Sequence, residues 1–236
     1  MMSLTPFHVP FAGHTLVGDI APCGDAAPIL ILHGAGQSSR QRFRPIREDF
    51  YAQGLASVAF DLIGHGDTGG VLHQSSLISR TQQAGAVIEA LSLPQPLAIL
   101  AASMGAYTAV KLLEQYAVDR LVLMVPAMYA AEAYTVPFDQ GFTEIIRRPR
   151  SWVESDAWKI LNAYTGRLLI VAGENDRVIP GEVIQWIETA AARASLCRRY
   201  TAPGASHNAL TDLRNRGSKH LDEVLGLIIE TLGAAV

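Results

Sequence analysis

The sequence predicts an α/β fold, with one mostly parallel, eight-stranded sheet that helices cover on both faces. Short apolar runs alternate along the chain with segments of helical periodicity, which is the pattern of such folds. Several runs are apolar throughout, as in strands buried on both sides. Polar residues that can exchange protons, such as His33 and Asp61, come directly after several of these runs. The length of 236 residues is typical of one domain, so we expect residues 1–236 to form a single unit.

The first two expected strands form a hairpin, residues 7–11 and 15–20, around Gly13 and His14. Residues 28–32, P-I-L-I-L, read as a buried strand because no polar residue interrupts them. The other expected strands are residues 55–60, 97–101, 120–125, 167–172 and 196–201.

Helical segments separate the later strands. Residues 75–91 place Leu77, Ala84, Val87, Ile88 and Leu91 near one face, as an amphipathic helix requires. The other expected helices are residues 42–53, 106–116, 181–193 and 217–232. We found no repeat and no long linker.

Composition excludes several classes of protein. The formal net charge is −3 with both signs mixed along the chain, so we expect no nucleic-acid partner. Cys23 and Cys197 are far apart, which argues against a disulfide framework or a metal site. We expect no cofactor. No signal peptide and no apolar run long enough for a membrane span are evident, so a cytoplasmic location is expected.

The stretch A-A-S-M-G, with Ser103 at its centre, joins an apolar run directly to a helical segment. A serine at a sharp strand-to-helix turn is a nucleophile elbow, whose usual pattern is G-x-S-x-G. Here Ala101 replaces the first glycine, and it is still small enough for the crowded turn. The alternative is an ordinary serine at a strand end.

Three further motifs occur at the ends of expected strands. They are H-G-A-G from His33, D-L-I-G-H-G from Asp61, and G-E-N-D-R-V-I-P from Gly173. Together with the Ser103 motif, and in this order, they resemble an α/β-hydrolase of the small serine esterase and lipase-like type over nearly the full chain.

This resemblance implies a catalytic triad of Ser103, Asp176 and His207, in the chain order of these enzymes. Serine needs a base to remove its proton, and a carboxylate holds that histidine in the useful tautomer. Glu174 is the rival carboxylate. His220 is the only other histidine after Asp176, and it falls near the start of the last helix.

The resemblance also implies two backbone donors for the oxyanion. We expect the N–H groups of Met104 and Ala35, with Gly36 as the alternative to Ala35. Structural roles are expected for His33, Asp61 and His65.

Residues 64–69 formally fit G-x-G-x-x-G, and Glu89 follows at the spacing of a dinucleotide-binding fingerprint. Extra residues separate this motif from its strand, and Glu89 lies within an expected helix, so nucleotide binding is disfavoured.

Residues 127–166 lie where α/β-hydrolases insert a small cap, and they are rich in aromatic residues. We expect Tyr129, Phe138, Phe142 and Trp158 to bind substrate, the alternative being that they pack the cap. Arg147, Arg148 and Arg150 could meet a phosphate group, but a solvated surface run is the more common role of such clusters.

The sequence therefore predicts a serine hydrolase that cleaves a small carboxylic ester or thioester through an acyl-enzyme. Alternatives remain: amide or C–C hydrolysis, perhydrolysis, acyl transfer, or a ligand sensor with little turnover. The sequence does not predict an oligomeric state.

Overall fold

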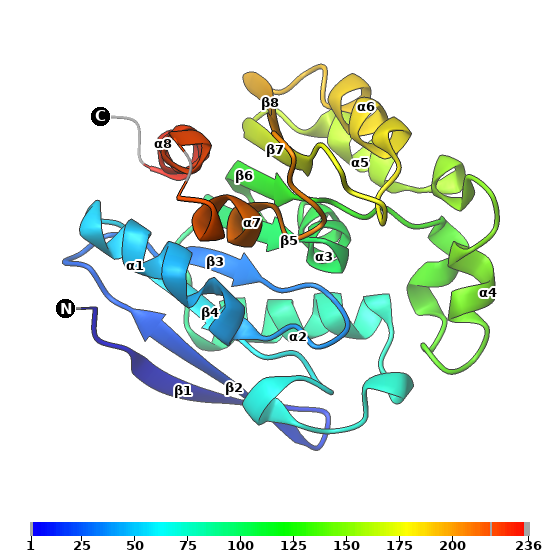
Figure 1. Cartoon of the computed structure of the whole chain (residues 1–236). Helices are drawn as coiled ribbons and strands as arrows, with labels where there is room; N and C mark the ends of the chain where they lie inside the picture. Colours follow the sequence, from blue (N-terminus) through cyan, green and yellow to red (C-terminus); the bar gives the residue numbers. More distant parts are fainter. Residues whose placement is uncertain (1, 218, 234–236) are drawn as a thin grey trace.

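The structure is a computed structural model that describes residues 2–217 and 219–233. Within these ranges, eight strands form one sheet in the order β1-β2-β4-β3-β5-β6-β7-β8 (Figure 1). β1 and β2 form an antiparallel hairpin, β2 runs antiparallel to β4, and the strands from β4 to β8 in this order are parallel. The strands are β1 (Thr5–Phe11), β2 (His14–Ala21), β3 (Ile29–Leu32), β4 (Ser57–Phe60), β5 (Leu97–Ala102), β6 (Val118–Met124), β7 (Arg167–Gly173) and β8 (Leu196–Ala202). The predicted mostly parallel, eight-stranded sheet is confirmed.

Helices cover both faces of the sheet. α1, α7 and α8 pack on one face, and α2, α3, α5 and α6 on the other (Figure 1). The α-helices are α1 (Arg44–Ala52), α2 (Leu77–Ala90), α3 (Met104–Leu112), α4 (Phe142–Ile146), α5 (Ala157–Ala163), α6 (Gly181–Ala190), α7 (Ala209–Asn215) and α8 (Lys219–Leu232). Short 3₁₀ helices are η1 (Arg40–Phe43), η2 (Gly66–Thr68), η3 (Leu72–Gln74), η4 (Ala131–Thr135) and η5 (Ser151–Glu154).

The central strand β3 shows why its sequence is apolar throughout. Side chains alternate between the two faces of a strand. Leu30 and Leu32 therefore join the core beneath α2 and α3, whereas Ile29 and Ile31 join the core beneath α1 and α8. All four are at most 2% exposed, and each contributes about 1.5–3 kcal/mol to folding by burial.

Some predicted boundaries were wrong. The hairpin turn lies at Ala12 and Gly13, one residue earlier than expected, and both have positive φ angles (45° and 79°), as tight hairpin turns require. α3 begins at Met104, directly after the serine, rather than at residue 106. α7 was not predicted, because a helix this short shows only one turn of apolar spacing, Ala209 and Leu213.

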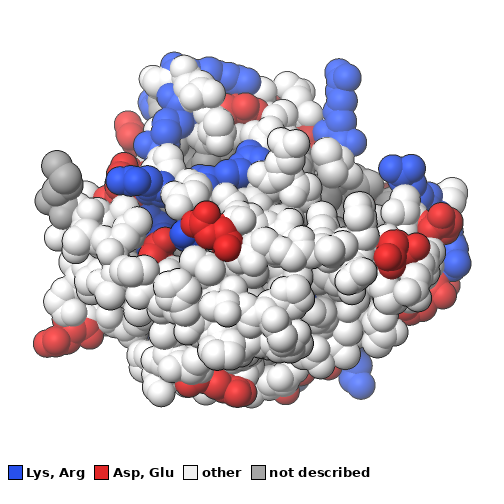
Figure 2. All heavy atoms as spheres, turned by 90° about the horizontal axis from the view of Figure 1, so that it is seen from below, with Lys and Arg blue, Asp and Glu red and all other residues white. Residues whose placement is uncertain are grey.

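Residues 127–166 connect β6 to β7 and contain only the short helices η4, α4, η5 and α5. In Figure 1, α4 projects beyond the edge of the layered body. The face seen in Figure 2 carries acidic and basic side chains near one another beside a broad uncharged area. Among the described residues, no helix combines the length and apolar character needed to cross a bilayer.

Candidate active site

The topology brings two loops together at the carboxyl ends of β3 and β5. β3 pairs with β4 on one side and with β5 on the other, so the strand order reverses here, and parallel α/β sheets form ligand sites at such points. The loop after β3 begins at His33, and Ser103 follows β5. A Cβ atom placed on Gly34 would lie 3.0 Å from the Cβ of Ser103, so only glycine fits there without movement.

Ser103 occupies a strained turn. Its φ and ψ angles are 52° and −121°, a conformation that residues with side chains rarely adopt. The flanking small residues are required by close contacts: a Cβ atom on Gly105 would lie 2.6 Å from the carbonyl oxygen of Leu32. Ala101 is fully buried within β5. The predicted strand–serine–helix junction is therefore present, with Ser103 at its tip.

The structure brings Ser103, His207 and Asp176 into one chain of contacts. The Nε2 atom of His207 lies 3.0 Å from Ser103 Oγ, and its Nδ1 atom lies 2.8 Å from Asp176 Oδ2. The other oxygen, Asp176 Oδ1, accepts hydrogen bonds from the N–H groups of Val178 (2.7 Å) and Ile179 (3.1 Å). The Asp176 side chain is only 5% exposed, so its position is set by protein groups rather than by water.

The rival carboxylate makes a different contact. Glu174 Oε2 accepts a hydrogen bond from the N–H of Gly204 at 2.6 Å, and thereby ties the loop after β7 to the loop after β8. In the described part of the chain, no hydrogen bond or ion pair joins it to His207. His220 lies on α8, where its Nδ1 atom is 2.9 Å from Glu223 Oε2.

The peptide between Gly34 and Ala35 is held from its carbonyl side. Gly34 O accepts from the Nη2 atom of Arg80 at 3.0 Å and lies 2.7 Å from His33 Nδ1. Because His33 Nε2 accepts the N–H of Leu62 at 3.0 Å, the ring proton is on Nδ1, which donates to Gly34 O. Burial, together with the nearby Arg80 charge, holds the pKa of His33 well below its usual value, so the ring is neutral at neutral pH.

The far end of the same loop is held by a buried ionic cluster. Asp61 Oδ1 accepts the N–H of Arg40 at 2.7 Å, and the Asp61 carboxylate also pairs with the Arg40 guanidinium. Arg40 Nε donates to Asp19 at 2.8 Å. The Nδ1 atom of His65 lies 2.9 Å from Ser38 O. Asp61 and His65 thus stabilise the loop, as expected from the sequence.

A pocket of about 290 Å³ opens beside Ser103 and His207. Gly34 and Ala35 form part of its wall, and most of the remainder comes from η1, α1 and α7. The lining includes the apolar residues Phe43, Pro45, Ile46, Met124, Val125, Ala209 and Leu210, and the polar residues Arg42, Asn208, Thr211, Arg214 and Asn215. α7, which was not predicted, is thus a wall of this pocket.

Residues 25–156, more than half of the chain, match the model of the family described as serine aminopeptidase, S33. The chain belongs to this family of α/β-hydrolases. The match includes Ser103 and the His33–Gly36 loop, and it ends before Asp176 and His207. No curated protein sequence matches the chain.

Solved structures similar to this S33-family chain share its fold at low sequence identity. An esterase from Pyrococcus furiosus, Pf2001, superposes with a TM-score of 0.72 and 18% identity, over 98% of this chain and 94% of that one. Est1E from Butyrivibrio proteoclasticus, with ferulic acid bound, gives 0.71 and 19%, over 95% and 96%. The thioesterase domain from the curacin biosynthetic pathway gives 0.69 and 16%, over 98% and 100%.

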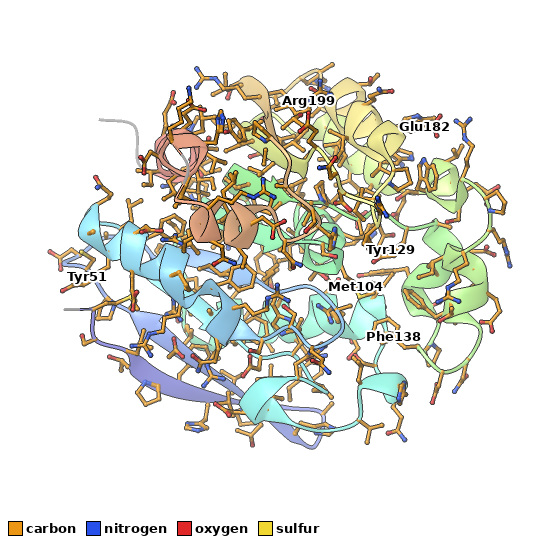
Figure 3. The ribbon with its side chains drawn as sticks, viewed as in Figure 1. Tyr51, Met104, Tyr129, Phe138, Glu182 and Arg199 are labelled. Carbon is orange, nitrogen blue, oxygen red and sulfur yellow. The ribbon has the colours of Figure 1, made fainter. Side chains whose placement is uncertain are left out.

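Three of the four aromatic residues expected to bind substrate pack with one another, and the fourth, Trp158, packs against α6. Phe142 is 4% exposed, and its ring centroid lies 4.7 Å from that of Phe138 and 5.8 Å from that of Tyr129. Figure 3 shows Tyr129 and Phe138 between the body of the S33-family chain and α4. Trp158 stacks obliquely on Trp186, with centroids 5.3 Å apart. None of the four predicted residues lines the pocket beside Ser103, and their contact with substrate stays a prediction.

Local structure accounts for two other sequence motifs, the basic cluster and the glycine-rich loop. In the basic cluster, Arg148 pairs with Glu132, and Arg150 Nε lies 3.7 Å from Glu182. In the glycine-rich loop, a Cβ atom on Gly66 would overlap the Asp61 carboxylate, which explains that glycine without a nucleotide. Within the described ranges, no group of three or more His, Cys, Asp or Glu residues is arranged to hold a metal ion.

Sequence reasoning did not identify Arg80. Its side chain is fully buried on α2, on the face that also carries Leu77, Ala84 and Val87. A charged residue at an apolar-face position of an amphipathic helix was the available signal, because buried charges are rare unless they have a specific role.

Proposed function

We propose that this chain is a serine hydrolase that cleaves a small carboxylic ester or thioester through an acyl-enzyme on Ser103. The observation that carries the proposal is the contact chain from Ser103 through His207 to Asp176, of which Ser103 and His207 line a pocket. A strained, partly buried serine with a histidine within hydrogen-bond reach and a carboxylate behind it is the arrangement that activates a hydroxyl nucleophile.

In the proposed reaction, Ser103 Oγ attacks the carbonyl carbon while His207 Nε2 takes its proton. The N–H groups of Met104 and Ala35 stabilise the oxyanion of the tetrahedral intermediate. The intermediate collapses and expels the alcohol or thiol, which takes the proton from His207. Water then attacks the acyl-enzyme, His207 accepts its proton and returns it to Ser103, and the carboxylic acid leaves. Asp176 keeps the imidazole oriented and stabilises its charged form.

Two features of the structure support the assignment of the oxyanion donors. Met104 is the first residue of α3, where a helix N–H has no partner within the helix. Ala35 is exposed and lines the same pocket as Ser103. In the described part of the chain, neither N–H forms a hydrogen bond, so both are free to bind an oxyanion. Gly36 remains the alternative to Ala35.

Amide hydrolysis is the second candidate, and the family match favours it, because the family is described as serine aminopeptidases. The titles of similar structures name esterases and a thioesterase, which supports ester or thioester substrates. The pocket volume of about 290 Å³ is at the small end of the range for ligand sites, so short acyl groups are the first substrates to test.

A substrate panel separates these possibilities. The protein is assayed with p-nitrophenyl esters of increasing acyl length, acyl thioesters and aminoacyl p-nitroanilides, with Ser103→Ala as the control. We expect steady turnover of the short esters or thioesters, loss of that turnover in Ser103→Ala, and fluorophosphonate labelling at Ser103 detected by mass spectrometry. Turnover of the anilides alone would favour the peptidase, and a single burst followed by retained product would favour a sensor. Turnover that persists in Ser103→Ala would contradict the proposal.

A further inference from the structure

Arg80 is a buried cation with no acidic partner. Its side chain is fully buried, and no Asp or Glu among the described residues pairs with it. Burial lowers the pKa of Arg80 to about 10, so the guanidinium remains charged at neutral pH. Removing an ion from water without a counter-ion is costly, and a fold that keeps such an ion must use it for specific contacts.

The Arg80 guanidinium donates its hydrogen bonds to the loop after β3. Nη2 donates to the carbonyl oxygens of His33 (2.8 Å) and Gly34 (3.0 Å). Nη1 lies 3.4 Å from Nε2 of His65, and Nε is buried without a partner in the described part of the chain. The shortest hydrogen bonds of Arg80 therefore hold the carbonyl groups of two successive residues, His33 and Gly34.

The Gly34 carbonyl belongs to the same peptide plane as the N–H of Ala35. In a planar trans peptide the C=O and N–H bonds point in opposite directions. A carbonyl held by both Arg80 and His33 therefore directs the Ala35 N–H away from them, and Gly34 and Ala35 both line the pocket at Ser103. A cationic donor on the carbonyl also polarises the peptide, which makes its N–H a stronger donor.

We propose that Arg80 is the positioning residue of the oxyanion site: it orients and polarises the Gly34–Ala35 peptide from behind. This inference rests on the proposed acyl transfer at Ser103. His33 supplies the second hydrogen bond to the same oxygen. Asp61 and His65 hold the other end of the loop, which restricts rotation of the loop as a whole.

Arg80→Met tests the proposal, because methionine removes the charge and both carbonyl hydrogen bonds of Nη2 without adding a polar group. The matched control is Gln83→Met on the same helix. Gln83 is also fully buried and accepts the N–H of Ile63 at 2.7 Å, in the loop after β4, which supplies no donor to the oxyanion. Both variants are compared with the wild type for kcat and KM on p-nitrophenyl acetate, and for the affinity of a trifluoromethyl ketone, which forms a tetrahedral oxyanion with serine.

Loss of one direct oxyanion donor lowers kcat by roughly 10²–10³-fold, so a misdirected donor should lower it by about 10–100-fold in Arg80→Met. KM should change by less than about 3-fold, and ketone affinity should fall in parallel with kcat/KM. Gln83→Met should lower kcat much less, because it keeps the hydrogen bonds of Arg80 to the carbonyls of His33 and Gly34. Fluorophosphonate labelling of the wild type at Ser103 is measured in parallel, so that a failure of the proposed function is recognised separately.

Arg80→Lys provides the second variant if the methionine variant does not fold, since lysine keeps the charge but cannot bond both carbonyls with one planar group. A kcat loss larger than that of Gln83→Met, with KM retained, supports the proposal for either variant. The proposal is overturned if a folded Arg80 variant loses no more kcat and ketone affinity than Gln83→Met, while the wild type turns over esters and is labelled at Ser103.

Discussion

The Nε2 atom of His207 lies 3.0 Å from Ser103 Oγ, although the two residues are 104 positions apart in the chain. They follow β8 and β5, which are separated in the sheet by β6 and β7. The loop after β8 must therefore reach back across the ends of two strands. Two carboxylates of the loop after β7 hold it in that position. Glu174 accepts the N–H of Gly204, and Asp176 contacts His207.

The first prediction concerns the carboxylate. Asp176→Asn should lower kcat by about 10²–10⁴-fold, because an amide favours the wrong imidazole tautomer and does not stabilise the charged ring. Glu174→Gln should lower kcat much less, since Glu174 contacts the N–H of Gly204 rather than His207. Steady-state kinetics and thermal melting of both variants provide the measurement. An inactive Glu174→Gln beside a nearly active Asp176→Asn would reverse the assignment.

The aromatic cluster gives the second prediction. Phe142→Ala should lower the free energy of unfolding by about 3–5 kcal/mol, because it empties a buried aromatic site. Leu210→Ala, in the pocket wall, should instead alter acyl-length preference. Denaturant unfolding and the ester panel measure the two effects. A change in acyl preference in Trp158→Ala or Phe138→Ala would support the substrate contacts expected from the sequence, and an unchanged profile would restrict those residues to packing.

Arg42 gives the third prediction. It lines the pocket and hydrogen-bonds the neutral amide oxygen of Asn208 at 2.7 Å, and no Asp or Glu is among the described residues that line the pocket. Arg42→Gln should lower kcat/KM by about 2- to 5-fold for an ester with a terminal carboxylate on its acyl group, because an exposed charge pair is weak. The neutral ester of the same length should be unaffected.

Arg44→Gln is the control for Arg42, because Arg44 is an exposed arginine on α1 that pairs with Glu48 at 3.2 Å and does not line the pocket. Equal losses on the charged and neutral esters would contradict a role for Arg42 in selectivity.

Acid sensitivity gives the fourth prediction. Burial, and then the Arg80 charge, lower the pKa values of His33 and His65 in the folded protein. In the unfolded chain these histidines have an ordinary pKa of about 6.5, so on acidification they bind protons before the folded protein does. The stability of the fold is therefore greatest above that pH and falls below it. The melting temperature should decrease between about pH 7 and pH 5, and less steeply in His65→Gln. His73→Gln, at an exposed position, should keep the wild-type slope. Identical slopes in all three proteins would rule out this source of acid sensitivity.

The sequence by itself determined the sheet and the order of the functional motifs. An apolar run such as residues 29–32 is typical of a strand covered on both faces, and A-A-S-M-G between an apolar run and a helical segment favours a sharp strand-to-helix turn. These constraints involve residues that are close in the chain, so they can be recognised in the sequence alone. The expected positions of Ser103, Asp176 and His207 at strand ends followed from the same patterns.

Only the tertiary structure decided which walls form the pocket and which buried groups hold its loops. The pocket lies between α1 and α7, whereas Tyr129, Phe138 and Phe142 pack with one another and Trp158 packs on Trp186. Arg80, 46 positions from Gly34, meets its carbonyl oxygen only because α2 packs beneath the end of β3. Such contacts depend on strand order and helix packing between distant segments, and periodicity along the chain carries no information about them.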